Sequence, residues 1–211
     1  MEISNLFSQF MAILKVFLHN IESYVSSLDF TKVADILLYN PREPLLFSSG
    51  AFLFIFLVFM IGYYCLRNKV DGRLLFVTLF SYYFFYKSSG FYFLLLIIVT
   101  LSDFYIARRV AKGKHPKLWL GLTLLIDLGL LAYFKYTNFF AGMVAQMIGG
   151  NFQPWDIFLP VGISFYTFKT ISYVIDVYRK KLEPMESLLD YAFYVSFFPT
   201  LLAGPITRAT D

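Results

Sequence analysis

Polar side chains recur along one face of an apolar stretch of this sequence, and they are its best candidates for chemistry. If residues 158–178 form an α-helix, with 100° between successive residues, five of these side chains lie on one side. They are Tyr166, Lys169, Thr170, Tyr173 and Asp176. A lysine inside a lipid-facing helix costs about 2.5 to 3.5 kcal/mol on insertion scales. Lys169 is therefore expected to face a cavity on the substrate side or to pair with a carboxylate.

Two carboxylates can be explained from sequence by charge pairs. Asp176 is within one turn of Arg179 and Lys180, so an interfacial charge pair is an alternative to a place in a substrate tunnel. Asp103 is followed closely by Arg108, and a charge pair at a helix end accounts for it.

Asp127 lies near the middle of an apolar segment, where an isolated charge is most costly. It is expected to make a polar contact with another helix. Its candidate partners are Lys169 and a group outside this sequence.

Two backbone breaks follow the polar helix, at Pro199 and at Gly204-Pro205. Each break frees backbone groups that lipid cannot satisfy, and such groups are tolerated where they are buried in protein or line a water-filled cavity. A segment over 199–208 is therefore a candidate for re-entry into the membrane. Arg208 would lie near a cavity mouth and hold a phosphate or carboxylate; the alternative is an ordinary helix end.

The same stretch resembles the membrane-bound O-acyltransferase family, within it the alginate O-acetyltransferase and D-alanyl-lipoteichoic-acid transfer branch. The resemblance covers about residues 46–208. Its main pieces are LPVGISFYTF from Leu159, ISY from Ile171, DVYR from Asp176, DYA from Asp190, YVSFFP from Tyr194, and GPI from Gly204 with Arg208. Lesser pieces are Phe47-Ser48-Ser49, Phe52-Leu53-Phe54, Lys135-Tyr136 and Asn138-Phe139-Phe140.

The resemblance implies O-acyl transfer, most simply of acetyl, to an extracellular or cell-wall polysaccharide. Acetyl-coenzyme A is the expected donor, with an acyl-carrier-protein thioester as the alternative, and no cofactor is expected to stay bound. The acceptor is a polysaccharide or a relay acyltransferase or secreted partner protein, reached through a tunnel lined by the polar face and the Gly-Pro-Ile segment.

The family's catalytic histidine follows the Gly-Pro-Ile segment, whereas His19 and His115 fall in no matched piece. We therefore expect a truncated N-terminal half of the acyltransferase domain over 45–211, with no catalytic residue of its own and no activity alone.

Composition places the chain among polytopic membrane proteins. Apolar residues make up 58% of it, aromatic residues 21% and charged residues 15%, far from the average of soluble proteins. We predict an all-α transmembrane fold, in which membrane lipid surrounds about five spans. The predicted spans cover 45–66, 74–86, 91–107, 118–134 and 158–178, with a further apolar piece over 139–148. The second span is short enough to thin the bilayer locally.

Basic residues follow the first, third and fifth spans, which places these loops in the cytoplasm and the N-terminus outside. We therefore predict a multi-pass protein of the cytoplasmic (inner) membrane. Residues 1–44 form a separate extension, with an amphipathic interfacial helix over 1–28 and a second short helix over 31–39. Packing is the simplest role for the extension, and a partner docking site is the alternative.

Several function classes find no support in the sequence. It has no metal-ligand spacing, phosphate-binding loop or dinucleotide motif. The net charge of +4 is explained by membrane topology and does not indicate nucleic acid. Cys65 is the single cysteine and reads as an apolar filler or, less simply, a lipidation site. Two other classes stay open: half of a transporter or flippase for polysaccharide or lipid-linked sugar, and a non-catalytic membrane scaffold.

Overall fold

The computed structural model describes residues 37–41, 44, 45, 47, 49–202 and 209. The chain divides into two compact units, Met1–Asn40 and Pro41–Asp211. In the first unit only residues 37–40 are described, so the predicted interfacial helix over 1–28, and most of the helix over 31–39, lie outside the described residues. The helices α3 to α9 all belong to the second unit.

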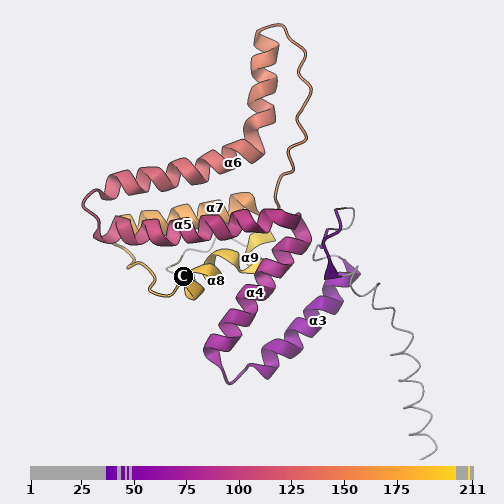
Figure 1. Ribbon diagram of the computed structural model, residues 1–211, viewed down its shortest axis with the longest axis vertical. Coiled ribbons are helices and arrows are strands. Elements are labelled where there is room, and N and C mark those ends of the chain that lie inside the picture. The colour runs from indigo at the N-terminus through magenta and orange to yellow at the C-terminus, as the bar shows by residue number, and fades with distance from the viewer. Residues whose placement is uncertain (1–36, 42–43, 46, 48, 203–208, 210–211) are drawn as a thin grey trace, which may run out of the picture. The chain divides into compact units, whose positions relative to one another are not determined.

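The described part of the second unit is helical, and no strand is assigned in it, which confirms the all-α class. In chain order the helices are α3 (Gly50–Cys65), α4 (Val70–Ser89), a 3-10 turn η1 (Gly90–Tyr92), α5 (Phe93–Lys112), α6 (Pro116–Met147), α7 (Ile163–Tyr178), α8 (Leu188–Ser196) and α9 (Phe198–Leu202). Figure 1 shows how they are arranged.

Two stretches are long and apolar enough to cross a membrane. They are Val70–Lys112, which contains an 18-residue window with a mean hydropathy of 2.0, and Pro116–Met147, which contains one with a mean hydropathy of 1.6. The first stretch is divided into two helices, α4 and α5. The division is at Gly90, whose φ of 62° ends α4. A third apolar helix, Phe52–Cys65, is shorter than a span. These lengths support a helical membrane protein and do not confirm the count of five spans.

Several predicted boundaries are corrected. The second span is not short: α4 runs to 20 residues, because polar residues at both ends continue the helix. The fourth span and the apolar piece after it form one 32-residue helix, α6. The first and fifth spans begin later than predicted, since residue 45 lies before α3 and residues 151–160 are not helical.

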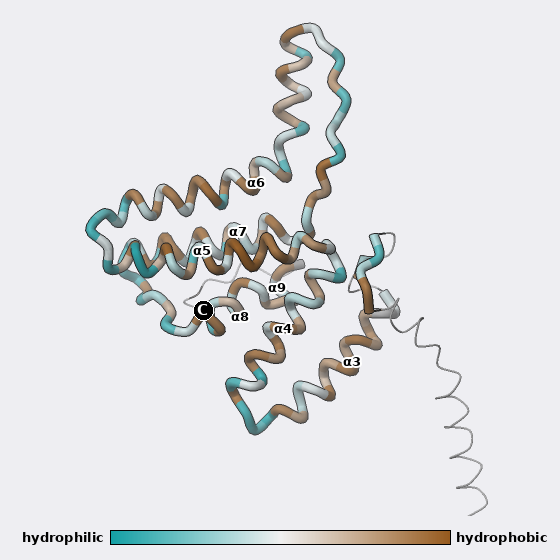
Figure 2. The backbone as a smooth tube through the Cα atoms, viewed as in Figure 1, coloured by the Kyte–Doolittle hydropathy of each residue, from teal (hydrophilic) through white to brown (hydrophobic). Residues whose placement is uncertain are grey.

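Helix α5 lies at the centre of the main core, packed against α6, α7 and α8. Its inward face includes Leu96, Val99 and Ala107, all at most 1% exposed. A second core, largely of phenylalanine rings, joins α3 and α4 to Phe198 of α9. Figure 2 shows hydrophilic residues gathered where α5 turns into α6, while the helix bodies are largely hydrophobic.

Candidate functional site

The polar face of α7 is buried against the other helices. Tyr166, Lys169, Thr170 and Tyr173 are at most 2% exposed, and Asp176 is 9% exposed. The helix begins after Gly162, whose φ of 77° is left-handed and favours glycine. A Cβ at this position would lie 2.7 Å from the Leu201 carbonyl oxygen, so the start of α7 is held tightly against α9.

Lys169 reaches into the junction between α8 and α9. Its ammonium donates one hydrogen bond of 2.9 Å to the Tyr194 carbonyl and another of 2.7 Å to the Thr200 hydroxyl. It also lies 5.1 Å from the centre of the Tyr194 ring, within range of a cation–π attraction. All three partners are neutral. The predicted carboxylate partner is therefore absent from the described surroundings of Lys169.

These bonds satisfy backbone groups that the helix break releases. Because α8 ends at Ser196, the Tyr194 carbonyl does not receive the N–H of Phe198; it receives Lys169 instead. The Phe198 N–H donates to the Ser81 hydroxyl of α4, at 3.3 Å. The sequence predicts that backbone groups freed at Pro199 are either buried in protein or line a water-filled cavity. In the described part of the break, the Tyr194 carbonyl and the Phe198 N–H bond to protein groups.

Asp127 contacts α7 through the residue after Lys169. The Thr170 hydroxyl donates a hydrogen bond of 2.8 Å to its Oδ2 atom, and both residues are at most 1% exposed. Of the two partners considered from sequence, Lys169 is thus wrong, since it bonds to the α8–α9 junction. Position 170 faces α6, whereas position 169 is turned 100° away from it.

Asp103 is not part of a helix-end charge pair. It is fully buried, and its carboxyl group lies beside that of Asp127. Arg108 turns away from it: the guanidinium lies 4.1 Å from the centre of the Phe104 ring and donates to the Glu186 carbonyl. The signal for a buried position is the spacing of Asp103 from Leu96, Val99 and Thr100, which places it on the inward face of α5.

Asp103 and Asp127 form the centre of a buried polar cluster contributed by four helices. Both oxygens of Asp103 and Oδ1 of Asp127 have no hydrogen-bond partner among the described residues, and the same holds for nearby hydroxyls. These hydroxyls belong to Thr123, Tyr166 and Tyr191. Two carboxylates away from water repel each other strongly if both are ionised. The cluster has the groups to hold a shared proton and to surround one negative charge with hydroxyl donors.

The remaining predicted residues are used separately. The Tyr173 hydroxyl accepts a hydrogen bond of 2.8 Å from the Met185 N–H, and its ring lies 4.7 Å from that of Tyr191. The Asp176 carboxylate has no ion pair with Arg179 or Lys180 in the described structure. The predicted residues therefore share one face of α7 but have different partners. Lys169 bonds to the α8–α9 junction, Thr170 to Asp127 of α6 and Tyr173 to the Met185 N–H.

Three predicted residues, Gly204, Pro205 and Arg208, lie outside the described residues. The candidate re-entrant segment is described only as far as 202. Cys65 is exposed.

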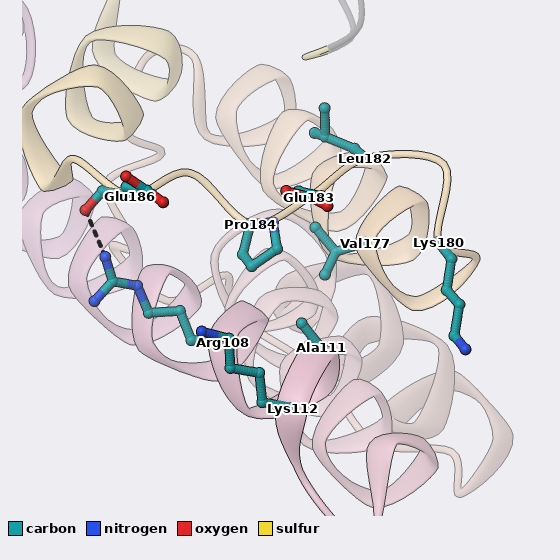
Figure 3. A pocket seen from close by; sticks show the side chains of 9 residues that line it. All are labelled: Arg108, Ala111, Lys112, Val177, Lys180, Leu182, Glu183, Pro184 and Glu186. Atoms are coloured by element: carbon teal, nitrogen blue, oxygen red, sulfur yellow. Dashed lines mark hydrogen bonds between the residues drawn. The ribbon is translucent and has the colours of Figure 1, made fainter.

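A cavity of about 690 Å³ opens where α5 and α7 end (Figure 3). Three basic residues, Arg108, Lys112 and Lys180, line it together with Glu183 and Glu186. From sequence, these basic residues are interpreted as topology signals, and Arg108 and Lys180 also as charge partners of Asp103 and Asp176; the cavity is not predicted. No group of three metal-ligating side chains occurs in the residues that the structure describes.

Comparison with known proteins shows what the chain is related to. It is 40% identical over 175 residues to a probable alginate O-acetylase AlgI of Pseudomonas aeruginosa, covering 79% of this chain and 34% of that protein. It is 38% identical over 175 residues to the protein of the same name from Azotobacter vinelandii, covering 79% and 35%. A peptidoglycan O-acetyltransferase of Helicobacter pylori is 31% identical over 198 aligned residues, covering 79% and 38%.

The chain is homologous to these O-acetyltransferases. The resemblance to the membrane-bound O-acyltransferase family is thereby confirmed over the matched stretch. The chain spans about a third of the length of these relatives. No family model matches the chain. No solved structure matches it either.

Proposed function

We propose that this chain is part of a membrane O-acyltransferase that transfers acetyl groups to a polysaccharide outside the cytoplasmic membrane. The observation that carries the proposal is the identity of 31–40% to alginate and peptidoglycan O-acetyltransferases over most of the chain. The apolar helices over 70–112 and 116–147 support the membrane setting.

The reaction is the attack of a sugar hydroxyl on an acyl thioester. The new ester C–O bond forms, the thioester C–S bond breaks, and the hydroxyl proton passes through a general base to the leaving thiol. Acetyl-coenzyme A is the proposed donor, and an acyl-carrier-protein thioester is the alternative. None of the buried side chains in the described helices is a histidine. We therefore assign the general base to the family's catalytic histidine, which none of the residues matched to the family supplies.

In the proposed membrane arrangement, five spans place the basic loops in the cytoplasm, where the donor is made. The break after α8, supported by Lys169, would stand beside the path between donor and acceptor. The proposed role of Lys169 is to stabilise the non-helical backbone of this break at membrane depth. Such backbone is tolerated in a membrane only beside a cavity or inside protein.

A transporter half gains less support. Its main argument is that intramembrane charges mark a transport path, but Lys169 and Asp127 both bond to neutral protein groups. These contacts account for the two residues structurally.

The test is acetyl transfer by membranes that contain the whole native protein and its partners. Isotope-labelled acetyl-coenzyme A is supplied on the cytoplasmic side, and label in polysaccharide is counted. Label above that of membranes lacking the protein supports the function; no label, with the protein present at normal level, contradicts it. Lys169→Ala and Arg208→Ala then test the assigned site, which is wrong if both transfer at the wild-type rate with normal expression.

A further inference from the structure

We propose that the cavity at the ends of α5 and α7 binds the phosphate groups of the soluble acyl donor. This inference rests on the proposed function and adds a location and a recognition chemistry to it. The ligand class is a phosphorylated nucleotide thioester, such as acetyl-coenzyme A. The residues that carry the proposal are Arg108, Lys112 and Lys180.

The three cations around the cavity keep their charge available to a ligand. The Arg108 guanidinium bonds to backbone carbonyls and stacks on Phe104, so its position is fixed while its charge is not neutralised. Glu183 and Glu186 are part of the same lining, yet neither forms an ion pair with a basic residue of the cavity in the described structure. Figure 3 shows the three basic side chains coming from both helix ends.

Lys180 occupies a position that favours glycine. It has a φ of 57°, the left-handed conformation, and is the one described residue other than glycine with positive φ. The Lys181 N–H bonds to the Asp176 carbonyl and the Lys180 N–H to the Val177 carbonyl, which is the Schellman pattern at the end of α7. Lysine at this position costs about 1 kcal/mol or more relative to glycine. The Lys180 side chain at this unfavourable backbone position lines the cavity. We infer that its positive charge contributes to ligand binding.

The chemistry and size of the cavity fit phosphate groups on a nucleotide. Its volume lies within the usual range for small-ligand sites, roughly 300–1,000 Å³. Arginine offers paired N–H donors to phosphate oxygens, and lysine offers a compact charge. A phospholipid headgroup presents the same phosphate chemistry, so the experiment must separate the two sources.

The experiment measures binding of coenzyme A by calorimetry to the full protein in nanodiscs of neutral phosphatidylcholine. Lys180→Gly removes the charge and also relieves the left-handed backbone, so this variant retains its fold. Lys112→Gln removes a second charge at the cavity. Lys181→Gln is the matched control, because it removes an equal charge from the same helix end but does not line the cavity.

We expect Lys180→Gly and Lys112→Gln each to weaken coenzyme A binding by about tenfold, the change for one lost charge-assisted hydrogen bond. Lys181→Gln should leave binding unchanged. Equal affinity in all four proteins overturns the proposal. A second arm repeats the titration in nanodiscs with phosphatidylglycerol. If this lipid abolishes coenzyme A binding to the wild type, the cavity belongs to a lipid headgroup and the donor assignment is overturned.

Acetyl transfer at saturating acetyl-coenzyme A, measured on the same variants, separates the two proposals. If acetyl is transferred but Lys180→Gly and Lys112→Gln bind coenzyme A as tightly as the wild type, the cavity assignment is overturned and the proposed enzyme class stands. Lysine-dependent binding without transfer supports the cavity and overturns the proposed reaction.

Discussion

The Lys169 ammonium donates a 2.9 Å hydrogen bond to the Tyr194 carbonyl, at the point where α8 stops. This bond joins the one buried lysine of α7 to the backbone group that the helix break leaves without its usual donor. Loss of a partner from a buried polar group costs more than the net value of the bond, because the remaining group stays out of water. Lys169 thus joins α7 to the backbone at the break through its bonds to Tyr194 and Thr200.

Replacement of Lys169 by methionine should destabilise the protein by about 1.5–3 kcal/mol, the usual contribution of a hydrogen bond to a charged group. The measurement is the temperature at which half of the detergent-purified protein remains folded. Lys135→Met is the control, because Lys135 is an exposed lysine on α6. Equal midpoints for Lys169→Met and the wild type would contradict the assigned role.

Loss of the Thr170 hydroxyl should also lower stability. Thr170→Val keeps the shape of the side chain but removes the hydrogen bond to Asp127, and a bond to a charged group contributes about 1.5–3 kcal/mol. Thr170→Ser retains the donor and should unfold close to the wild-type midpoint. The bond has no stabilising role if the valine and serine variants unfold together.

Asp103→Asn should raise the midpoint. The substitution removes one of two adjacent buried carboxyl groups and adds an N–H donor facing Asp127. Asp103→Leu, of similar size but without polar atoms, should lower the midpoint because it places an apolar side chain against the buried carboxyl group of Asp127. A clear loss of stability in the asparagine variant would show that the paired carboxyl groups are not mutually repulsive.

Gly162→Ala should separate the start of α7 from α9. The left-handed backbone and the 2.7 Å approach to the Leu201 carbonyl both disfavour a Cβ, at a cost of about 1–3 kcal/mol. Gly129→Ala is the matched control: no atom lies within 4 Å of the added carbon, and alanine in a helix interior gains about 0.5–1 kcal/mol over glycine. Opposite signs in the two midpoints are expected, and a neutral Gly162→Ala would contradict the close packing.

The helical class and the approximate positions of α3 to α7 follow from the apolar runs of the sequence. Hydropathy does not locate helix ends, because polar ends such as Lys87-Ser88-Ser89 continue α4 and are buried by tertiary packing. The break at Pro199 is predictable, since proline lacks the N–H that a helix requires. The hydrogen bond from Lys169 to the break is not predictable, because the sequence is equally consistent with a carboxylate as the partner of this lysine.

Asp103 shows where single-residue reasoning fails. Its nearest charge along the chain is Arg108, and a local pair is the simplest explanation from sequence. In the folded protein, α6 brings Asp127 beside it and the 182–187 loop draws Arg108 away. Such contacts depend on which helices become neighbours, and a period of 3.6 residues gives only the face of each helix.

The most direct test of the central claim is the transfer of labelled acetyl from acetyl-coenzyme A to polysaccharide by membranes that contain the whole protein and its partners. The account predicts label in the polysaccharide, released by mild alkali as expected for an ester. Membranes that carry the folded protein at native level but put no label into polysaccharide would contradict it.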